Sequence, residues 1–228
     1  MSEAAPANAS ARGMRSGDTT AAGPIGVLLH RPRLYDLFIE LALIGREPSF
    51  RRQLLDLAGP RPGEAILDVG CGTGSLALMA REAVGATGVV CGVDASAEMI
   101  SWARQKARRI GVEADFRRAP AQALPYPDAL FDVVLSTLML HHLPKKARTQ
   151  LAAEARRVVK PGGRVLVVDF AEESRRKGFM RHLHHPHRNV ALHEILALLE
   201  GAGLSIVASG PLGMQTVHFA LAAVRSSC

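Results

Sequence analysis

Apolar and polar positions follow two alternating periods along the chain, and this alternation predicts an α/β domain. Short apolar runs are typical of strands buried on both faces, whereas apolar residues at three- and four-residue steps are typical of helices. We expect strands at Ala65–Val69, Val89–Asp94, Glu113–Arg117, Phe131–Ser136 and Arg164–Phe170. Between them we expect helices at Ser75–Val84, from Ser96 to Arg109, and at Lys145–Val159. Such alternation implies right-handed crossovers and a parallel sheet with helices on both faces.

Glycine and proline mark the ends of these elements. Gly85 and Gly111 are expected to stop the first two helices, and Ser96 is a good N-cap for the second. The run Pro161-Gly162-Gly163 is expected to turn the chain between the third helix and the strand that follows it.

The segment before the first strand changes character near residue 30. Residues 1–30 are rich in Ala, Gly, Ser and Pro and predict a disordered tail, so we expect one domain over residues 31–228. Two helices, Pro32–Gly45 and Ser49–Ala58, are expected to lead into the first strand.

The C-terminal part predicts a different pairing of strands. After a helix at Ala191–Glu200, two strands, Leu204–Ser209 and Thr216–Val224, flank the short connection Gly210–Gly213. A connection of this length predicts a hairpin, so the last two strands should be antiparallel.

Composition adds limits on the environment and partners. The chain has 228 residues, is 48% apolar and carries a formal charge of +7. A basic chain favours anionic partners such as a membrane surface, or has a solvated basic surface only. Nucleic acid is not expected, because no basic stretch is interleaved with aromatic residues. Cys71, Cys91 and Cys228 form no metal-binding spacing and no disulfide framework, which makes a reducing cytoplasm the simplest compartment.

The first strand ends in a glycine-rich turn that predicts a ligand site. Gly70, Gly72 and Gly74 follow Asp68 and Val69 and precede a helix, whose positive dipole end therefore lies at the turn. Open α/β sheets bind ligands at this edge, where the strands have their carboxyl ends. The turn therefore indicates a cradle of the nucleotide-binding type.

The residues around the turn narrow the choice of nucleotide. Ser75 stands where the dinucleotide fingerprint has its third glycine, and no Lys follows as in a phosphate loop. Asp68 would repel a pyrophosphate but suits an ammonium or sulfonium group. Asp94, which ends the second strand, is placed to accept hydrogen bonds from both ribose hydroxyls. An adenosine joined to a cation, without pyrophosphate, describes S-adenosylmethionine.

Four ordered motifs between about residues 60 and 170 resemble the class I S-adenosylmethionine-dependent methyltransferases. They are Ile66-Leu67-Asp68-Val69-Gly70-Cys71-Gly72-Thr73-Gly74, Gly92-Val93-Asp94-Ala95-Ser96-Ala97-Glu98-Met99, Ala123-Leu124-Pro125-Tyr126-Pro127-Asp128-Ala129-Leu130-Phe131-Asp132 and Arg156-Arg157-Val158-Val159-Lys160-Pro161-Gly162-Gly163. The subgroup that the chain resembles is the ubiquinone/menaquinone C-methyltransferases. The resemblance implies a seven-stranded, mostly parallel Rossmann-like sheet with helices on both faces and an antiparallel C-terminal hairpin.

The resemblance also implies a set of cofactor-binding residues. They are Asp68, Gly70, Gly72, Gly74, Asp94, Ala95, Met99, Ala121, Gln122 and Ser136. Met99 is expected against the adenine, with plain core packing as the alternative. Many family members carry an acid just before Ala121, whereas this chain has Pro120, which leaves the adenine amino group without that contact.

The acceptor side is expected around His141 and His142, after the fourth strand. A neutral histidine there can remove a proton from the acceptor, although a structural or surface role is the alternative. The Asn-Pro-Pro-Tyr motif and the Pro-Cys pair of other methyltransferase groups are absent, so the resemblance points to small-molecule acceptors. In the family the leading helices line the acceptor pocket, which would place Tyr35 near the methyl group, with an ordinary packing role as the alternative.

A second histidine cluster, His182, His184, His185 and His187, is interrupted by Pro186 and has no interleaved acid or cysteine. We expect a basic loop over the acceptor pocket there and no metal site. Arg175, Arg176 and Lys177 precede this cluster and would suit an anionic acceptor or a lipid headgroup.

These observations predict methyl transfer from S-adenosylmethionine to a small, partly apolar acceptor, such as a quinone precursor or an aromatic natural product. Two alternatives stay open: a phospholipid-headgroup N-methyltransferase with peripheral membrane contact, and a cofactor-binding regulatory module without turnover. The oligomeric state is left open.

Overall fold

The computed structural model describes residues 47–170 and 190–225, with a seven-stranded sheet at their centre. The helices are α2 (Glu47–Ala58), α3 (Ser75–Val84), α4 (Ala97–Ile110), η1 (Leu140–His142), α5 (Lys145–Val158) and α6 (Leu192–Gly201). The strands are β1 (Ala65–Val69), β2 (Val89–Asp94), β3 (Asp115–Arg118), β4 (Phe131–Thr137), β5 (Val159–Phe170), β6 (Ser205–Leu212) and β7 (Met214–Ala223). The predicted alternation of strand and helix is therefore confirmed across the described residues.

The strand order is β3-β2-β1-β4-β5-β7-β6, and only the pairs that involve β7 are antiparallel. The predicted parallel sheet and C-terminal hairpin are both confirmed. The order reverses between β1 and β4, because β1 pairs with β2 on one side and with β4 on the other. A crevice at the carboxyl ends of the strands is expected at such a point.

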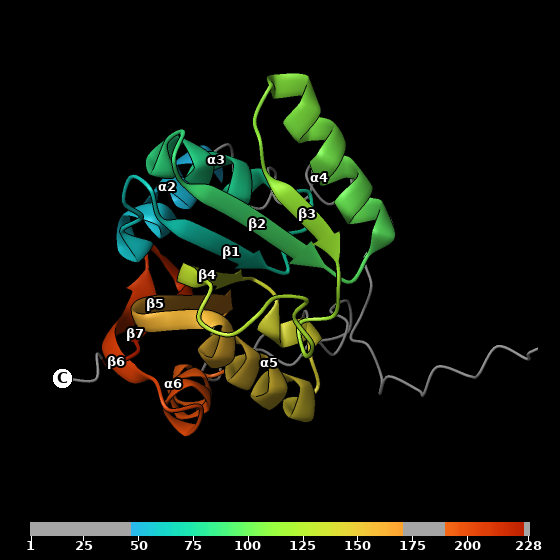
Figure 1. Ribbon diagram of the computed structural model, residues 1–228. Helices are drawn as coiled ribbons and strands as arrows, with labels where there is room; N and C mark the ends of the chain where they lie inside the picture. The colour runs from blue at the N-terminus through green and yellow to red at the C-terminus, as the bar shows by residue number, and fades with distance from the viewer. Residues whose placement is uncertain (1–46, 171–189, 226–228) are drawn as a thin grey trace, which may run out of the picture.

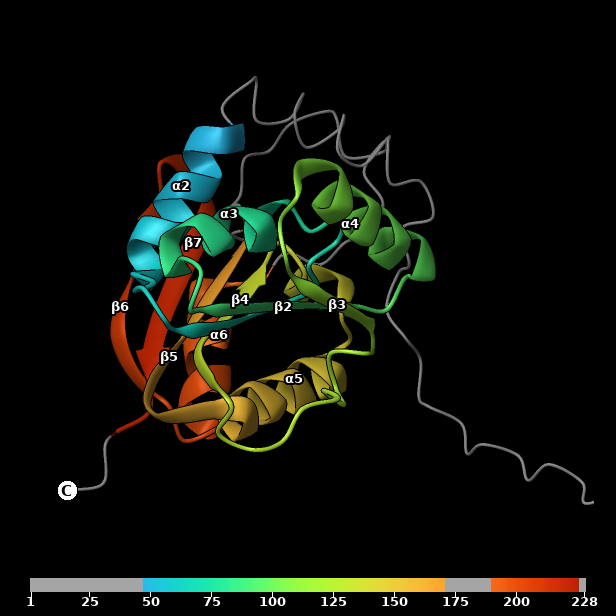
Figure 2. The same ribbon diagram turned by 45° about the horizontal axis from the view of Figure 1, so that its top comes forward.

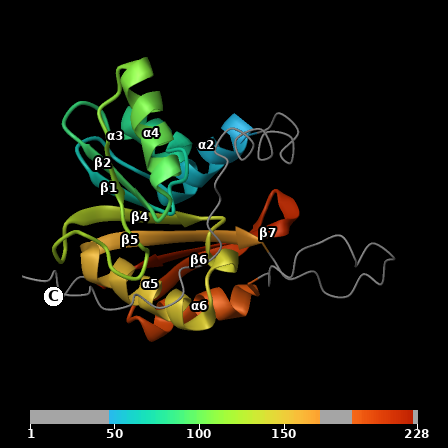
Figure 3. The ribbon, with the colours of Figure 1, turned by 90° about the vertical axis from the view of Figure 1, so that its right-hand side faces the viewer.

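Helices cover both faces of the sheet, as Figures 1 and 2 show. α2, α3 and α4 lie on one face and α5 and α6 on the other, and the side view in Figure 3 separates the two layers. This arrangement explains why β1, β4 and β5 read as continuous apolar runs, since their side chains are buried on both faces.

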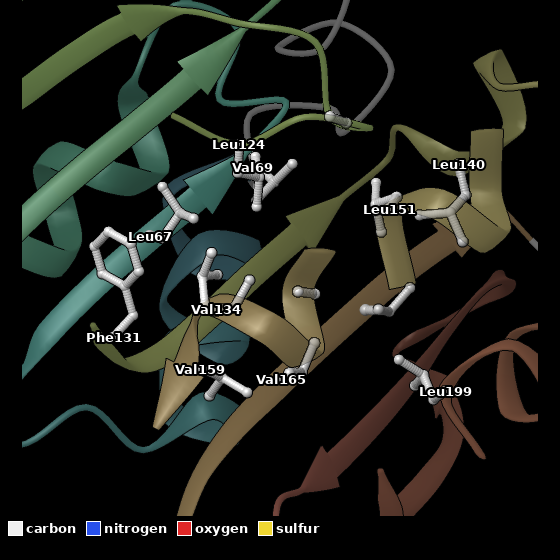
Figure 4. Packing of buried hydrophobic residues seen from close by; sticks show 14 of the residues in the cluster. Leu67, Val69, Leu124, Phe131, Val134, Leu140, Leu151, Val159, Val165 and Leu199 are labelled. Atoms are coloured by element: carbon white, nitrogen blue, oxygen red, sulfur yellow. The ribbon is translucent and has the colours of Figure 1, made fainter. Parts of the chain in front are cut away.

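Each face has its own buried apolar cluster. On the α5 and α6 side, Leu151 and Leu199 pack with strand residues such as Leu67 and Val134, as Figure 4 shows. On the other side, the helices pack against the alternate strand residues, among them Ile66. Each fully buried side chain of this size contributes about 1.5–3 kcal/mol relative to leaving it exposed.

The predicted helix ends are confirmed by their caps. The Ser96 Oγ accepts a hydrogen bond from the Met99 backbone N–H, and Gly85 and Gly111 are the C-caps of α3 and α4. Both glycines have φ near +67° to +68°, a left-handed conformation that favours glycine.

The prediction for β5 was wrong at its start. The run Pro161-Gly162-Gly163 belongs to the strand, which begins at Val159 instead of Arg164. The Gly162 N–H donates to the Val224 carbonyl, and the Val224 N–H donates to the Gly163 carbonyl. These bonds keep the run in the sheet as an irregularity in the pairing with β4.

Other boundaries shift by a few residues. β3 begins at Asp115, α6 covers Leu192–Gly201, and the hairpin is tighter than predicted, with Gly213 alone between β6 and β7. The expected tail at residues 1–30, the helix Pro32–Gly45 with Tyr35, and residues 171–189 lie outside the described residues.

Candidate functional site

The glycine-rich turn links β1 to α3 and is anchored on β2. The backbone N–H groups of Gly70 and Cys71 donate to the Val93 carbonyl at 2.8 and 2.9 Å. Lys106 of α4 adds a tie, because its Nζ lies 2.7 Å from the Ser75 Oγ. The turn is therefore held in place by the elements on both sides of it.

Gly74 shows why the turn needs glycine. Its φ is +78°, and a Cβ placed there would lie 2.7 Å from the Phe116 Cζ and 2.9 Å from the Ala103 Cβ. Any other residue would be strained in the backbone and would push α3 away from β3 and α4. Because Gly74 has no side chain, the first turn of α3 can pack closely against β3 and α4 beside the glycine turn.

Asp94 occupies the end of β2 and faces the turn. Its Oδ2 accepts from the Gly72 N–H at 3.0 Å, and its Oδ1 accepts from the Ser96 N–H at 2.8 Å. Burial raises the pKa of this carboxyl, and the backbone N–H groups of Ser96, Gly72 and Ala95 oppose the rise. A carboxylate offers about four acceptor positions, so these N–H groups leave room for a ribose hydroxyl.

Asp68 lies in β1 on the face that α2 and α3 cover. It is 1% exposed, and within the described part of the chain its Oδ1 has no hydrogen-bond partner. Burial raises its pKa to about 7; Arg51 of α2 lowers the pKa and Asp94 raises it. A buried acceptor that lacks a partner fits a ligand that brings an ammonium group.

Ser136 stands on the opposite face of the sheet, where β4 pairs with the end of β1. It is 1% exposed and pairs in register with Val69. Its Oγ also has no hydrogen-bond partner among the described residues. Asp68 and Ser136 are thus two buried polar groups beside the glycine turn, which the predicted cofactor would satisfy.

The residues expected around the adenine follow the ends of β2 and β3 in the chain. Met99 is 2% exposed in the first turn of α4, and Ala95 accepts a hydrogen bond from the Arg118 Nε through its carbonyl. The Ala119 N–H donates to the Asp94 carbonyl at 3.0 Å, so the segment with Ala121 and Gln122 continues beside Asp94. Their contacts with a cofactor stay a prediction.

The expected acceptor residues lie beyond β1, at the ends of β4 and β5. The His141 Nδ1 lies 2.6 Å from the Asp169 Oδ1, and the His142 ring lies 3.9 Å from the His141 ring between centroids. Met139, two residues before His141, borders the glycine turn, because a Cβ on Gly70 would lie 2.6 Å from the Met139 Cγ. The histidine turn and the cofactor turn are therefore in contact.

Three residues of this region were not identified from the sequence. Asp169 carries a recognisable signal, since it comes at the end of an apolar strand as Asp68 and Asp94 do. Arg51 and Lys106 lie on amphipathic helices, where exposed basic residues are common and give no signal of their own.

The described residues contain neither a metal-binding cluster nor a membrane-spanning helix. Within residues 47–170 and 190–225 no group of histidine, cysteine or acidic residues has the geometry to hold a metal ion. The cluster His182–His187 and the run Arg175–Lys177 fall outside these residues. None of the described helices combines the length and the apolar character needed to span a membrane.

Comparisons with known proteins find a family match in the central part of the chain. Residues 66–163 match the family described as a methyltransferase domain. The ubiquinone/menaquinone biosynthesis C-methyltransferase UbiE of Escherichia fergusonii is 35% identical over 140 residues, which is 60% of this chain and 55% of that protein. The chain thus spans about half the length of the curated relatives it matches.

Solved structures share the fold. A SAM-dependent methyltransferase from Aquifex aeolicus is similar with a TM-score of 0.69 and 23% identity, covering 85% of this chain and 98% of that one. The [4+2]-cyclase SpnF is similar with a TM-score of 0.64 and 22% identity, covering 78% and 81%. At these identities the likeness concerns the fold, and the cyclase among these proteins shows that the fold is not tied to one reaction.

Proposed function

We propose that the chain is a class I S-adenosylmethionine-dependent methyltransferase similar to the UbiE C-methyltransferases, and that it methylates a small, partly apolar acceptor. The acceptor class that we favour is a quinone precursor or a related aromatic molecule. The observation that carries the proposal is the acidic cradle at the carboxyl ends of β1 and β2, which is formed by Asp68, Asp94 and the glycine turn.

The cradle distinguishes S-adenosylmethionine from other nucleotides. The Asp68 carboxyl, buried and without a described partner for its Oδ1, is suited to the cationic amino acid part. Asp94 retains acceptor positions for a ribose. The Asp68 carboxyl would repel a pyrophosphate, so a dinucleotide fits poorly. When bound, S-adenosylmethionine supplies an electrophilic methyl group on sulfur.

The protein's own residues then have mainly an orienting role. Methyl transfer requires the acceptor atom, the methyl carbon and the sulfur to be aligned, and fixed positions supply much of the rate enhancement. The turns after β1 and β4 touch through Gly70 and Met139, so the two ligands would meet at this contact. A quinone ring in its reduced form is the acceptor that we favour at this edge.

The test is direct turnover. Full-length protein is incubated with methyl-labelled S-adenosylmethionine and reduced naphthoquinones that lack the ring methyl group, and in parallel with a metabolite extract. We expect labelled product and an equal amount of S-adenosylhomocysteine. Asp94→Ala should lose most of this turnover at low cofactor concentration, whereas Asp115→Ala, which removes a partly exposed acid from the start of β3, should not.

Two results would redirect the proposal. Cofactor binding without labelled product in any mixture would favour the module without turnover. Label found only in lipid headgroups of the extract would favour the phospholipid N-methyltransferase.

A further inference from the structure

A groove runs between α5 and α6, which lie next to each other on one face of the sheet (Figure 3). It encloses about 370 Å³, a volume typical of sites for small molecules. Its described lining residues include none from the glycine turn and neither Asp68 nor Asp94. The family match and the relatives' names assign no ligand to this groove.

One end of the groove lies at the positive ends of two helix dipoles. Arg148 of α5 pairs with Glu194 of α6 at 3.5 Å, and each of them is within the first four residues of its helix. The two helices therefore begin at the same end of the groove. The residues before them, Pro144 and Ala191, give no side-chain cap, so the first backbone N–H groups of both helices are not satisfied by a cap residue.

Two cationic side chains face a single acid at this end. Lys145, Arg148 and Glu194 all line the groove, and no described residue pairs with the Lys145 ammonium group. Arg148 is only 4% exposed, which leaves its charge poorly hydrated. Its distance of 3.5 Å to Glu194 is longer than the roughly 2.7–2.9 Å of a charge-assisted hydrogen bond. Glu194 therefore compensates the positive charge only in part, and an anion suits this end.

The rest of the groove is apolar and has small side chains on its walls. Ala153 of α5 and Ala197, Gly201 and Ala202 of α6 line it, together with Leu198. A Cβ placed on Gly201 would meet nothing within 4 Å, so there is open space beside this residue. The groove thus combines a cationic end with an apolar channel.

We propose that this groove is a second ligand site, and that it takes a small organic anion with an apolar body, such as an aromatic carboxylate. The anionic group lies by Lys145 and Arg148, and the body lies along the small residues of α6. Both parts are needed, because an anion alone gains little from an exposed lysine and an uncharged apolar molecule leaves the cationic end uncompensated. The site is independent of which acceptor the protein methylates.

Arg148 connects the groove with the histidine turn. Its Nε donates to the carbonyls of Leu140 and Leu143 at 2.9 Å each, and these two carbonyls flank His141 and His142. An anion bound to the Arg148 guanidinium competes with these carbonyls for the same positive charge. Occupancy of the groove should therefore be felt in the backbone of the histidine turn.

Backbone NMR of full-length ¹⁵N-labelled protein tests the site without turnover. The protein is titrated with 2-naphthoate in the presence of S-adenosylhomocysteine, which occupies the cofactor cradle. We expect saturable shifts at Thr149 and Ala197, with a dissociation constant on the order of 1 mM or tighter for a ligand of this size. The backbone signals of Leu140 and His141 should move with the same constant.

Two further probes separate the parts of the ligand. 2-Naphthamide keeps the rings and removes the charge, whereas inorganic phosphate keeps a charge and removes the rings. Each should bind at least about tenfold more weakly than 2-naphthoate. Equal binding of the amide would mean an apolar groove without anion recognition, and equal binding of phosphate would mean a plain anion site. Either result would overturn the proposal.

Charge variants test the cationic end. Lys145→Gln should weaken 2-naphthoate binding about two- to fivefold, whereas Lys146→Gln, which changes a neighbour outside the groove lining, should not. Glu194→Gln removes the competing acid and should tighten binding by a similar factor. The opposite order of the Lys145 and Glu194 variants would contradict an anionic ligand.

A filled groove tests the apolar channel. Gly201→Leu adds a side chain where there is open space, at a residue whose backbone is not left-handed, so the variant is expected to fold. It should abolish the saturable shifts, while Gln150→Leu, at an exposed position of α5 outside the lining, should keep them. Unchanged 2-naphthoate binding in Gly201→Leu would place the probe elsewhere and overturn the proposal. A protein that binds 2-naphthoate here but not S-adenosylhomocysteine would contradict the proposed function and leave this site standing.

Discussion

At the scale of single residues, Asp68, Asp94 and Asp169 share one position and differ in surroundings. Each is the last or the penultimate residue of a buried strand. Asp94 accepts from two backbone N–H groups, Asp169 accepts from His141 and two backbone N–H groups, and Asp68 has an oxygen without a described partner. Strand ends supply the position, and the neighbouring donors decide which ligand or residue each carboxyl can bind.

Asp94 is the first residue to test. Asp94→Ala should weaken S-adenosylmethionine binding by about 1.5–3 kcal/mol, roughly 10- to 150-fold, because charge-assisted hydrogen bonds to the ribose are lost. Part of the loss would be indirect, because the Gly72 N–H loses its acceptor and the glycine turn is then held less firmly. Calorimetry measures the affinity, with Asp115→Ala as the control. Unchanged affinity in a folded Asp94→Ala protein would contradict the assignment.

Asp68 predicts a pH dependence. Burial raises its pKa to about 7, from 3.8, so the folded protein keeps this proton between those values. The contribution of the Asp68 carboxyl to the free energy of unfolding therefore falls as pH rises from about 4 to 7, and it is constant above 7. A bound cation favours the ionised form, so cofactor binding at pH 6 should release close to one proton, and affinity should rise about fivefold from pH 6 to 7.

Calorimetry in buffers of different ionisation enthalpy counts that proton. Arg51 and Asp94 act on Asp68 in opposite directions, and both are retained in Asp68→Asn, which makes this variant the matched control. It should bind more weakly and release no proton at pH 6. A wild type that also releases none would show that Asp68 is ionised before binding or does not meet the cation.

The sequence predicted Asp94 and the glycine turn because their signals are local: an acid or a glycine at a fixed place after an apolar strand. It did not predict the pair His141–Asp169, whose members are 28 residues apart in sequence. Their contact follows from the pairing of β4 with β5 and from the turn after β4, where Leu138 has φ +53°. Such a contact depends on register, which one sequence does not give.

At the scale of elements, a predicted boundary was accurate where the hydrogen bonds of the terminal backbone groups are local. α3 and α4 end where predicted because glycine C-caps provide a local stop. β5 starts earlier than predicted because Gly162 and Gly163 find hydrogen-bond partners at Val224. Proline and glycine indicate a turn locally, and only the neighbouring strand shows that the turn remains in the sheet.

Substitutions at Gly74 and Gly111 measure how tightly α3 packs against its neighbours, because one glycine is crowded and the other is not. Both have positive φ, +78° and +68°, but a Cβ at Gly111 meets nothing within 4 Å, whereas one at Gly74 meets Phe116 and Ala103. Gly111→Ala should cost about 1–2 kcal/mol of backbone strain alone. Gly74→Ala should cost a further ~1–3 kcal/mol from overpacking.

Urea denaturation gives the two free energies of unfolding. Gly74→Ala should also weaken cofactor binding, because α3 and the cradle move together, and Gly111→Ala should not. Equal destabilisation by the two substitutions would mean that α3 shifts without cost, and the cradle would then be less rigid than its packing implies.

At the scale of the whole molecule, the sequence pattern predicts the fold but not the acceptor. The parallel sheet and the two helix layers were predictable from periodicity, because burial on both faces leaves a strong pattern. The strand order itself came only from the structure. The acceptor was not predictable, because the residues expected to face it come from separate turns, whose contacts depend on strand register. The likeness to a cyclase as well as to methyltransferases shows that the shared fold does not settle the reaction.

The cofactor class can be tested on the whole molecule through its stability. A ligand held by the ends of β1 and β2 stabilises a sheet whose seven strands form one unit. At 100 times the dissociation constant, S-adenosylhomocysteine should add about 2.7 kcal/mol and raise the melting temperature by about 5–10 °C. NAD at the same concentration should raise it by less than about 1 °C, because Asp68 opposes a pyrophosphate. Asp94→Ala should reduce the first shift in proportion to its loss of affinity. An equal shift with NAD would mean that the cradle recognises adenosine alone, and Asp68 would then have no part in selecting the cofactor.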